Sequence, residues 1–287
     1  MRVAIVSGKG GSGKSSISAS LIGLSSRVVA VDCDVDASNL PLLFDYDVEV
    51  QESFVSGCRV AIDPKLCIKC GRCIENCRFG ALKMTEDGVT TVPFLCEACG
   101  LCARLCPRGA ITLEDEANSN IYISRFSNGI MVHGELKPGE DNSGKMIARM
   151  RVLADEQMKR ENIDLQILDG PPGIGCPVLS TVTGIDRVVI VSEPTLSGLS
   201  DLKRIYQVSS SFCRDIMVII NKADINDESR NAIREFCHEK SVSIVAEIPF
   251  DRRLVESQIQ RTNIVEYAPD SIPAMEIKKA YNIICAR

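Results

Sequence analysis

The chain opens with a short apolar run, Val3 to Ser7, that leads directly into the octapeptide GKGGSGKS at positions 8–15. This octapeptide satisfies the pattern G-x-x-x-x-G-K-[ST], in which glycines let successive backbone N–H groups turn inward around a phosphate. We expect a helix from about Lys14 to Ser25 and a second strand from Arg27 to Val31. This β–loop–α–β opening predicts an α/β fold, a P-loop NTPase with a mostly parallel, doubly wound sheet.

The loop predicts a site for ATP and Mg²⁺. Lys14 should reach the β and γ oxygens, and Ser15 should ligate the metal. The start of the helix adds a favourable dipole for anions. A chance glycine-rich turn is the alternative, but the strand before the loop, the helix after it and the acids downstream argue against it. The residues of this segment expected at the nucleotide are Gly8, Lys9, Gly10, Gly11, Ser12, Gly13, Lys14, Ser15 and Ser16.

Cysteine is unusually frequent, with 14 among 287 residues, and eight of them lie between Cys67 and Cys106. Residues 67–84 and 96–113 repeat each other at a fixed offset of 29. Each copy follows C-x2-C-x2-C-x3-C, the spacing of bacterial ferredoxins. Since no signal peptide is visible, this density indicates metal binding rather than disulfides.

The spacing predicts two [4Fe–4S] clusters, because the fourth cysteine of each run in such ferredoxins ligates the other cluster. The first cluster is assigned to Cys67, Cys70, Cys73 and Cys106. The second is assigned to Cys96, Cys99, Cys102 and Cys77. Structural zinc is the alternative, but it usually closes on two separated pairs of ligands. Arg78 stands where the run usually has proline, which leaves the chain path after Cys77 open.

Beyond the cysteines the strand and helix pattern resumes. We expect a hairpin of Ile121–Phe126 and Gly129–Gly134, then a helix from about Gly144 to Arg160. Further strands at 165–168, 187–192, 216–220 and 242–248 alternate with helices. The P-loop domain is therefore expected to be discontinuous, residues 1–57 and 114–287, with a two-cluster ferredoxin-like module inserted at 58–113.

Composition excludes several classes of function. The net charge is -5 and no basic stretch stands out, so no nucleic-acid surface is expected. Two His residues leave little room for zinc chemistry built on histidines. No apolar run approaches the length of a membrane span, and no signal peptide is visible, so we expect a cytoplasmic protein without integral membrane association.

The two lysines of the loop, Lys9 and Lys14, make it resemble the deviant Walker ATPases, which include nitrogenase iron protein and the Min, ParA and Mrp types. In that family the extra lysine reaches the partner's nucleotide across a dimer interface. The resemblance implies this role for Lys9, and a homodimer, or a heterodimer with a paralogue, around ATP. A solvated loop lysine is the alternative. With its insert, the chain resembles Min-like ATPases that contain a ferredoxin domain.

The same resemblance implies roles for acids that follow two strands. Asp34 best matches the catalytic position of switch I, Asp36 is its rival, and Asn39 is a candidate to assist. Asp169, followed by GPPG, resembles the Walker B acid that holds Mg²⁺ through water, and the N–H of Gly173 would meet the γ-phosphate. A plain acidic turn is the alternative at Asp169.

Three further residues gain a meaning from the family. Asn221 would bind the adenine edge and Pro249 would flank the ring. Cys176 lies near the place where nitrogenase iron protein holds a bridging cluster, but without a C-x-x-C the preferred interpretation is packing or helix capping.

Three functions stay open. Eight dedicated ligands favour ATP-gated electron transfer, or redox-linked regulation of a partner, by a slow, partner-stimulated ATPase. An iron–sulfur carrier is the second, and a Min-like positioning ATPase is the third. The partner, a redox protein or an apo-protein, is not identified by the sequence.

Overall fold

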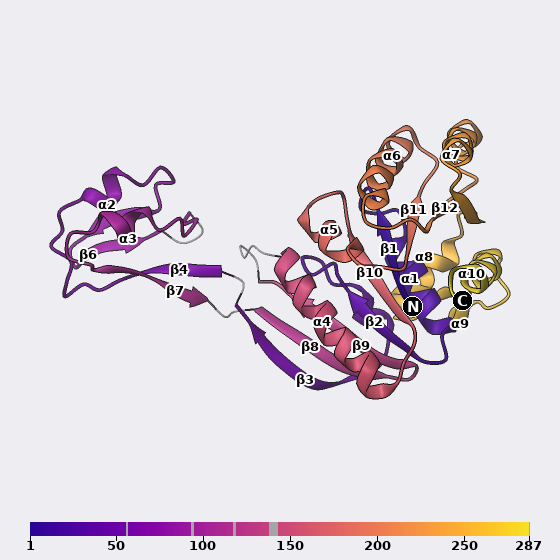
Figure 1. Ribbon diagram of the computed structural model, residues 1–287, viewed down its shortest axis with the longest axis horizontal. Coiled ribbons are helices and arrows are strands. Elements are labelled where there is room, and N and C mark those ends of the chain that lie inside the picture. The colour runs from indigo at the N-terminus through magenta and orange to yellow at the C-terminus, as the bar shows by residue number, and fades with distance from the viewer. Residues whose placement is uncertain (56, 93–94, 117–118, 138–142, 287) are drawn as a thin grey trace. The chain divides into compact units, whose positions relative to one another are not determined.

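Nine strands form one large sheet (Figure 1). A computed structural model describes residues 1–55, 57–92, 95–116, 119–137 and 143–286. Their contacts divide the chain into two units. We call Met1–Glu52, Asn120–Glu135 and Ser143–Arg287 the sheet unit, and Ser53–Ser119 with Leu136–Asn142 the cysteine unit.

The sheet is parallel over its first seven strands and turns antiparallel between β9 and β8. Parallel strands must be crossed over by helices, so both faces of such a sheet are covered and its strands are apolar throughout. In spatial order the strands are β13 (Ser243–Ile248), β12 (Ile216–Asn221), β11 (Arg187–Ser192), β1 (Arg2–Ser7), β10 (Gln166–Pro172), β2 (Val28–Asp32), β9 (Gly129–Glu135), β8 (Ser119–Phe126) and β3 (Tyr46–Phe54).

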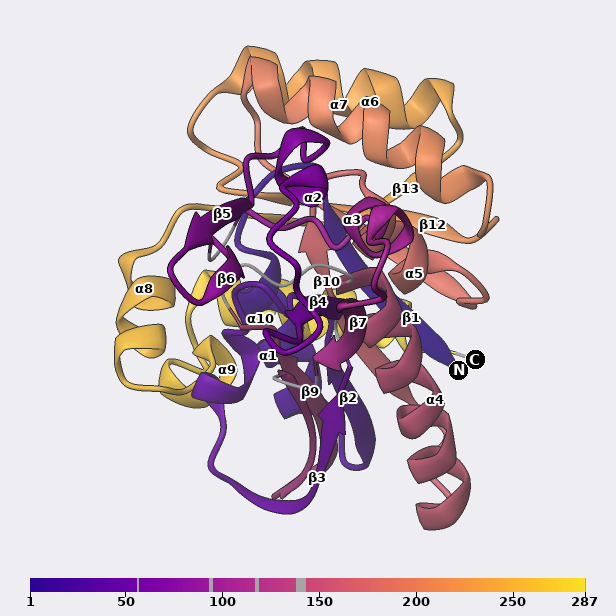
Figure 2. The ribbon, with the colours of Figure 1, turned by 90° about the vertical axis from the view of Figure 1, so that its left-hand side faces the viewer.

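Helices cover the sheet in two layers. On one face four helices pack each against the next, and Figure 2 shows the last two side by side. They are α4 (Ser143–Glu161), α5 (Cys176–Val182), α6 (Leu196–Ser210) and α7 (Asp227–Glu239). The other layer consists of η1 (Leu40–Leu43), α1 (Lys14–Leu24), α8 (Arg252–Ile259), α9 (Ile264–Tyr267) and α10 (Ile272–Ile284). Val3 and Ile5 alternate toward this second layer, where they share one buried core with α1 and α10.

The predicted α/β architecture is confirmed, and the hairpin around Ser127–Gly129 is confirmed as β8 and β9. The prediction missed β3, although Tyr46, Val48 and Val50 alternate with polar residues in the period of a strand. It also missed α8 and α9, short helices after the last strand. No helix in the part of the chain described here is long and apolar enough to cross a membrane.

The cysteine unit is framed by a pair of antiparallel strands, β4 (Gly57–Ile62) and β7 (Ile111–Glu116), which run side by side in Figure 1. Between them lie two short helices and a second strand pair. These elements are α2 (Arg72–Glu75), β5 (Leu82–Thr85), β6 (Gly88–Thr91) and α3 (Leu101–Leu105). The unit begins before and ends after the range 58–113 expected for the insert, because β4 and β7 extend that range at both ends.

The two cysteine copies share one backbone conformation. Left-handed residues recur at the same places, which are Lys69 and Ala98 (φ 55° and 45°), Gly71 and Gly100 (77° and 75°), and Gly80 and Gly109 (62° and 61°). Non-glycine residues seldom adopt this conformation, so its recurrence at the paired positions of Lys69 and Ala98 shows that the sequence repeat is also a structural repeat. A left-handed residue between two cysteines turns successive N–H groups toward one side of the loop.

Candidate functional site

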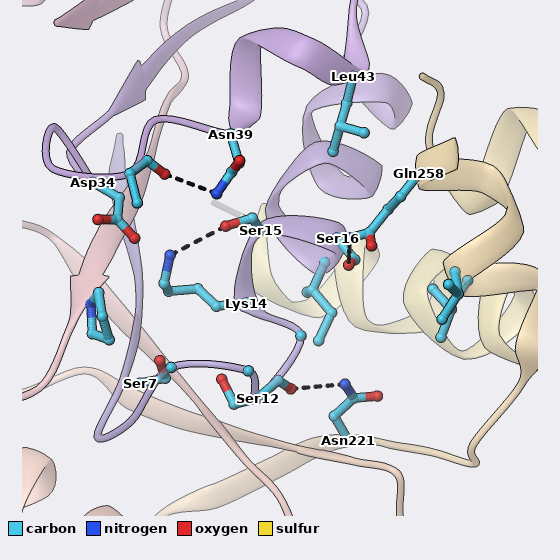
Figure 3. Close-up of a pocket in the computed structure, with 18 of the residues that line it drawn as sticks. Ser7, Ser12, Lys14, Ser15, Ser16, Asp34, Asn39, Leu43, Asn221 and Gln258 are labelled. Atoms are coloured by element: carbon cyan, nitrogen blue, oxygen red, sulfur yellow. Dashed lines mark hydrogen bonds between the residues drawn. The ribbon is translucent and has the colours of Figure 1, made fainter. Parts of the chain in front are cut away.

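A pocket of about 940 Å³ lies at the carboxyl ends of the parallel strands in the sheet unit. Ligands of open α/β sheets gather at this edge. The loop that follows β1 lines the pocket, and Figure 3 shows the side chain of Lys14, the first residue of α1, turned toward Ser15. Predicted residues that line the pocket are Gly10, Gly11, Ser12, Gly13, Lys14, Ser15, Ser16, Asp34, Asp36, Asn39 and Asn221.

Gly13 can be nothing but glycine at the start of α1. Its φ is 87°, and a Cβ there would lie 2.1 Å from Nδ2 of Asn221. Asn221, at the end of β12, donates from this same atom to the carbonyl oxygen of Ser12 at 2.8 Å. The side chain of Asn221 therefore clamps the loop at Ser12, as the dashed line in Figure 3 shows.

Lys14 and Asp169 form a buried ion pair, with Nζ 3.0 Å from Oδ1 and side-chain exposures of 6% and 1%. Ser18 donates to the same oxygen at 2.8 Å, and Nζ of Lys14 lies 3.3 Å from Oγ of Ser15. Burial lowers the pKa of Lys14, but the charge and hydrogen bond of Asp169, together with the charges of Asp32 and Asp34, outweigh it, and the net pKa is raised. Lys14 is therefore a full positive charge next to the residue predicted to ligate Mg²⁺.

The acidic run that begins at the end of β2 contains a fully buried residue, Asp32, and a half-buried one, Asp34. Asp32 is fully buried and accepts from Ser38 Oγ at 2.8 Å and from Leu40 N at 3.2 Å, so it holds the following loop in place. Burial, and then repulsion by Asp169, raises the pKa of Asp32 to about 7. Burial also raises the pKa of Asp34, which lines the pocket.

Three buried polar atoms at this site have no hydrogen-bond partner among the residues that the structure describes. They are Oγ of Ser12, Oδ2 of Asp169 and Oδ1 of Asn221. An unpaired buried polar atom costs about 1–3 kcal/mol, so such atoms are expected to find a partner in a ligand. The hydroxyl of Ser12 suits a phosphate, and the carboxylate oxygen of Asp169 suits hydrated Mg²⁺. The amide oxygen of Asn221 suits an amino group.

Other predicted residues lie outside the pocket lining. Gly8 packs against α6, where a Cβ would meet Asp201 at 2.6 Å. The N–H of Gly173 donates to the carbonyl oxygen of Ser7 at 3.0 Å and is thus already engaged. Pro249 is absent from the lining, whereas its neighbours Ile248 and Phe250 are part of it.

Lys9 turns away from the pocket of its own chain. Its Nζ lies 2.5 Å from Oε1 of Glu193 and 3.0 Å from Oγ of Ser197. Lys222 holds the other oxygen of Glu193 at 2.9 Å and also donates to the carbonyl of Gly11 at 3.1 Å. Glu193 therefore pairs with both lysines; Lys222 also lines the pocket, whereas Lys9 does not. The sequence analysis missed Glu193 because nothing in its local pattern marks it.

The cysteine unit holds two further pockets, and each contains one predicted set of ligands. The first is lined by Cys67, Cys70, Cys73 and Cys106. The second is lined by Cys77, Cys96, Cys99 and Cys102, and Cys73 belongs to the lining of both pockets. The second measures about 270 Å³ and the first only about 20 Å³, so the first must open for any body larger than a water molecule.

The environment of the cysteines differs along each run. Hydrogen bonds from the backbone of Val89 and Lys69 lower the pKa of Cys67, which favours the thiolate that binds metals. The N–H of Ala110 donates to Sγ of Cys106 at 3.3 Å. Burial raises the pKa of Cys73. No group of three or more His, Cys, Asp or Glu side chains in the described ranges is close enough to hold a single metal ion.

Arg78 does not change the path of the chain after Cys77. The N–H of Gly80 donates to the carbonyl of Cys77 at 3.2 Å, and the N–H of Gly109 donates to that of Cys106 at 3.2 Å. The same turn therefore follows both runs, with or without proline. Cys176, at the start of α5, is exposed rather than packed in the core, which corrects the preferred interpretation of packing.

Residues 3–264 match the CbiA family, the CobQ/CobB/MinD/ParA nucleotide binding domain. The chain belongs to this family. Membership makes it an ATP-binding, MinD/ParA-like P-loop ATPase, in agreement with the loop and the pocket. The family description names no iron–sulfur module, so the cysteine unit must be interpreted from its own residues.

Relatives and solved structures agree with this membership. Uncharacterized protein MJ0578 of Methanocaldococcus jannaschii is 40% identical over 231 residues, 79% of this chain and 80% of its own. The septum site-determining protein MinD of Pyrococcus horikoshii, solved with Mg-ADP, is 18% identical with a TM-score of 0.59, covering 99% and 96%. A chain of the MinC:MinD cell division protein complex of Aquifex aeolicus is 18% identical with a TM-score of 0.55, covering 100% of this chain and 96% of that chain. Likeness at this identity establishes the fold.

Proposed function

We propose that this ATPase binds Mg–ATP at the P-loop pocket, hydrolyses it, and couples its nucleotide state to two [4Fe–4S] clusters in the cysteine unit. The clusters would serve one-electron exchange with a protein partner. The observation that carries the proposal is the grouping of the eight cysteines. Each of two pockets contains three cysteines of one run and the fourth cysteine of the other run, and Cys73 lines both pockets.

The donor set fits iron–sulfur chemistry better than a single ion. A zinc ion draws four sulfurs to about 2.3 Å from one point, and the described cysteines do not converge so closely. A four-iron cluster is several atoms wide and spaces its thiolates more widely. The paired left-handed residues before the second cysteine of each run turn backbone N–H groups toward the loop, and such groups stabilise a cluster's sulfurs.

The nucleotide half of the proposal assigns roles to residues of the pocket. Lys14 would leave Asp169 for the phosphates, and Asp169 would then hold Mg²⁺ through water together with Ser15. Asp34 would orient the attacking water, with Asp36 as its rival. The unpaired oxygen of Asn221 would accept from the adenine amino group.

Lys9 supports an ATP sandwich between two chains, as the family resemblance implies. Within one chain it lies on Glu193, outside the pocket of its own nucleotide. It is therefore in a position from which it must move to reach any phosphate. The dimer, homo- or heteromeric, remains part of the proposal, as do a cytoplasmic location and the absence of nucleic-acid binding.

The test is anaerobic reconstitution followed by iron and sulfide analysis and EPR in the presence of ADP and of a non-hydrolysable ATP analogue. We expect eight irons per chain and a nucleotide-dependent change in potential or in accessibility to a chelator. Zinc in place of iron, or four irons or fewer, would refute the cluster assignment. Two clusters with identical behaviour in both nucleotide states would refute the coupling alone.

A Min-like positioning ATPase is the second candidate, and the comparisons by themselves favour it, since the solved neighbours include cell division proteins. A positioning ATPase of the Min type normally uses a basic amphipathic helix at its C-terminus to bind membranes. Here the apolar side of α10 is already used, because Ala274, Ile277, Ala280 and Ile284 are buried in the core. Sedimentation with anionic vesicles, with and without ATP, separates the two functions.

An iron–sulfur carrier is the third candidate. The measurement is the iron that remains after ATP turnover beside an apo-ferredoxin acceptor, with Lys14→Ala as the control. Loss of about one cluster that depends on ATP and on Lys14 would establish the carrier. Full retention of both clusters would leave electron transfer.

A further inference from the structure

Three exposed basic side chains surround the first cysteine pocket. Lys69, Arg72 and Arg108 line it together with its four cysteines. Lys69 donates to the carbonyl oxygen of Glu86, and no carboxylate of the described residues forms an ion pair with any of the three. These cations therefore present unneutralised charge at the mouth of one pocket.

The second cysteine pocket has no excess of positive charge. Its lining carries one cation and one anion, Arg78 and Glu97, and the guanidinium of Arg78 lies over the ring of Phe79 at 4.7 Å. The two copies of the repeat share a backbone but differ in charge. Because the conformations match, the difference lies in the side chains and not in the fold.

An apolar side chain completes the charged face. Ile68 lines the same pocket and is 57% exposed, and the nearby Leu66 is 42% exposed. An exposed apolar centre within a polar rim is the usual anatomy of a protein interface. The cysteine unit thus has one face on which contact area and charge occur together.

We propose that this face, Ile68 with Lys69, Arg72 and Arg108, is the docking surface for an acidic electron-carrier protein. The proposal rests on the proposed function, because it requires a cluster in the first pocket. Charge complementarity selects the partner: three unpaired cations attract a carrier with an acidic face and raise its association rate, more so at low salt. One electron would pass from the reduced carrier, which is oxidised, to the iron–sulfur cluster that the four cysteines of the first pocket would hold, which is reduced; no proton or leaving group is exchanged.

The alternative is that the three cations only offset the negative charge of the thiolates and of the cluster they hold. In that case they would alter the reduction potential and leave partner association unchanged. The two accounts predict different dependences on the charge of the electron donor, so the experiment varies the donor.

The experiment compares the holoprotein with the triple variant Lys69→Gln, Arg72→Gln and Arg108→Gln. A control triple variant, Arg59→Gln, Lys83→Gln and Arg104→Gln, removes the same charge from exposed positions of the unit that do not line the pocket. Stopped-flow spectroscopy follows reduction by a chemically reduced acidic bacterial-type ferredoxin and by an uncharged small mediator. Iron content and EPR are measured first.

We expect the pocket variant to react with the ferredoxin at least roughly tenfold more slowly at low ionic strength, with a flatter salt dependence. The control variant and the reaction with the uncharged mediator should stay within about twofold, as charge steering requires. Equal slowing by both variants, or equal slowing with both donors, would overturn the docking surface. Wild-type protein without iron would instead refute the proposed function.

Discussion

Nζ of Lys9 lies 2.5 Å from Oε1 of Glu193, and Nζ of Lys222 lies 2.9 Å from the other oxygen of the same carboxylate. Lys9 comes from the phosphate-binding loop, and Glu193 follows β11. The pair therefore determines where the extra lysine of the loop stays while no second chain is present.

Glu193→Gln should strengthen ATP-dependent dimerisation about two- to fivefold, because it removes a partly exposed ion pair worth up to about 1 kcal/mol that holds Lys9 within its own chain. Sedimentation velocity with a non-hydrolysable ATP analogue measures the effect. Lys9→Ala in the same background should abolish the gain. A weaker dimer for Glu193→Gln would contradict the holding role.

Lys14→Met should lower the free energy of unfolding by about 3–5 kcal/mol, because it leaves the buried carboxylate of Asp169 without its counter-charge. Asp169→Asn should also lower the free energy of unfolding, because it leaves the buried ammonium group of Lys14 without its counter-charge. The double variant should be less destabilised than the sum of the two single variants by about 1 kcal/mol or more. Urea unfolding of the four proteins measures this, and strict additivity would contradict the pair.

Asn221→Ala should weaken ATP binding by about ten- to hundredfold, since the unpaired amide oxygen can no longer receive the adenine amino group. Pyrophosphate, which has no base, should bind with nearly unchanged affinity. Isothermal titration calorimetry with both ligands checks this. Equal losses for both would mean that Asn221 acts only by bracing the loop through Ser12.

Cys106→Ser should affect the same cluster as Cys67→Ser, and Cys77→Ser should affect the other, because each fourth cysteine lies in the pocket of the opposite run. EPR of the reduced proteins should therefore show the signal of the first cluster altered in both Cys67→Ser and Cys106→Ser. In Cys77→Ser the signal of the second cluster should be altered instead. If Cys106→Ser instead altered the signal of the cluster that Cys96, Cys99 and Cys102 hold, the crossed assignment would be wrong.

Stability should also depend on pH through His133. Burial lowers its pKa from the ordinary 6.5 to about 4, and the side chain lies against Tyr122 and Oγ of Ser124. Between those values the unfolded chain takes up a proton that the folded protein refuses, so stability falls as the pH drops from about 6.5 to about 4.

As the pH falls from about 6.5 to about 4, the unfolding free energy of the wild type should decrease by about 3 kcal/mol more than that of His133→Gln. Taking the difference cancels the opposite contribution of Asp32, whose raised pKa makes stability fall as the pH rises. Denaturant titrations at several pH values give the measurement. Parallel curves for the two proteins would contradict the assignment.

Strong local patterns predicted much of the fold. The octapeptide, the apolar strands and the acids after β2 and β10 are contiguous in sequence, and each has a periodicity or spacing that only a few structures satisfy. Weak patterns failed: β3 lies with both faces exposed, and α8 and α9 are too short for their period to stand out.

The sequence by itself determined the parallel P-loop sheet, the glycine-rich loop after β1 and the repeat of the cysteine runs, because the spacing of neighbouring residues controls them. Only the tertiary structure decided that Glu193 holds Lys9, that Asn221 clamps the loop at Ser12, and that three unpaired cations meet at one cysteine pocket and not at the other. Those relationships join residues far apart in the chain. Their distances depend on how strands and turns are packed, which no local pattern encodes.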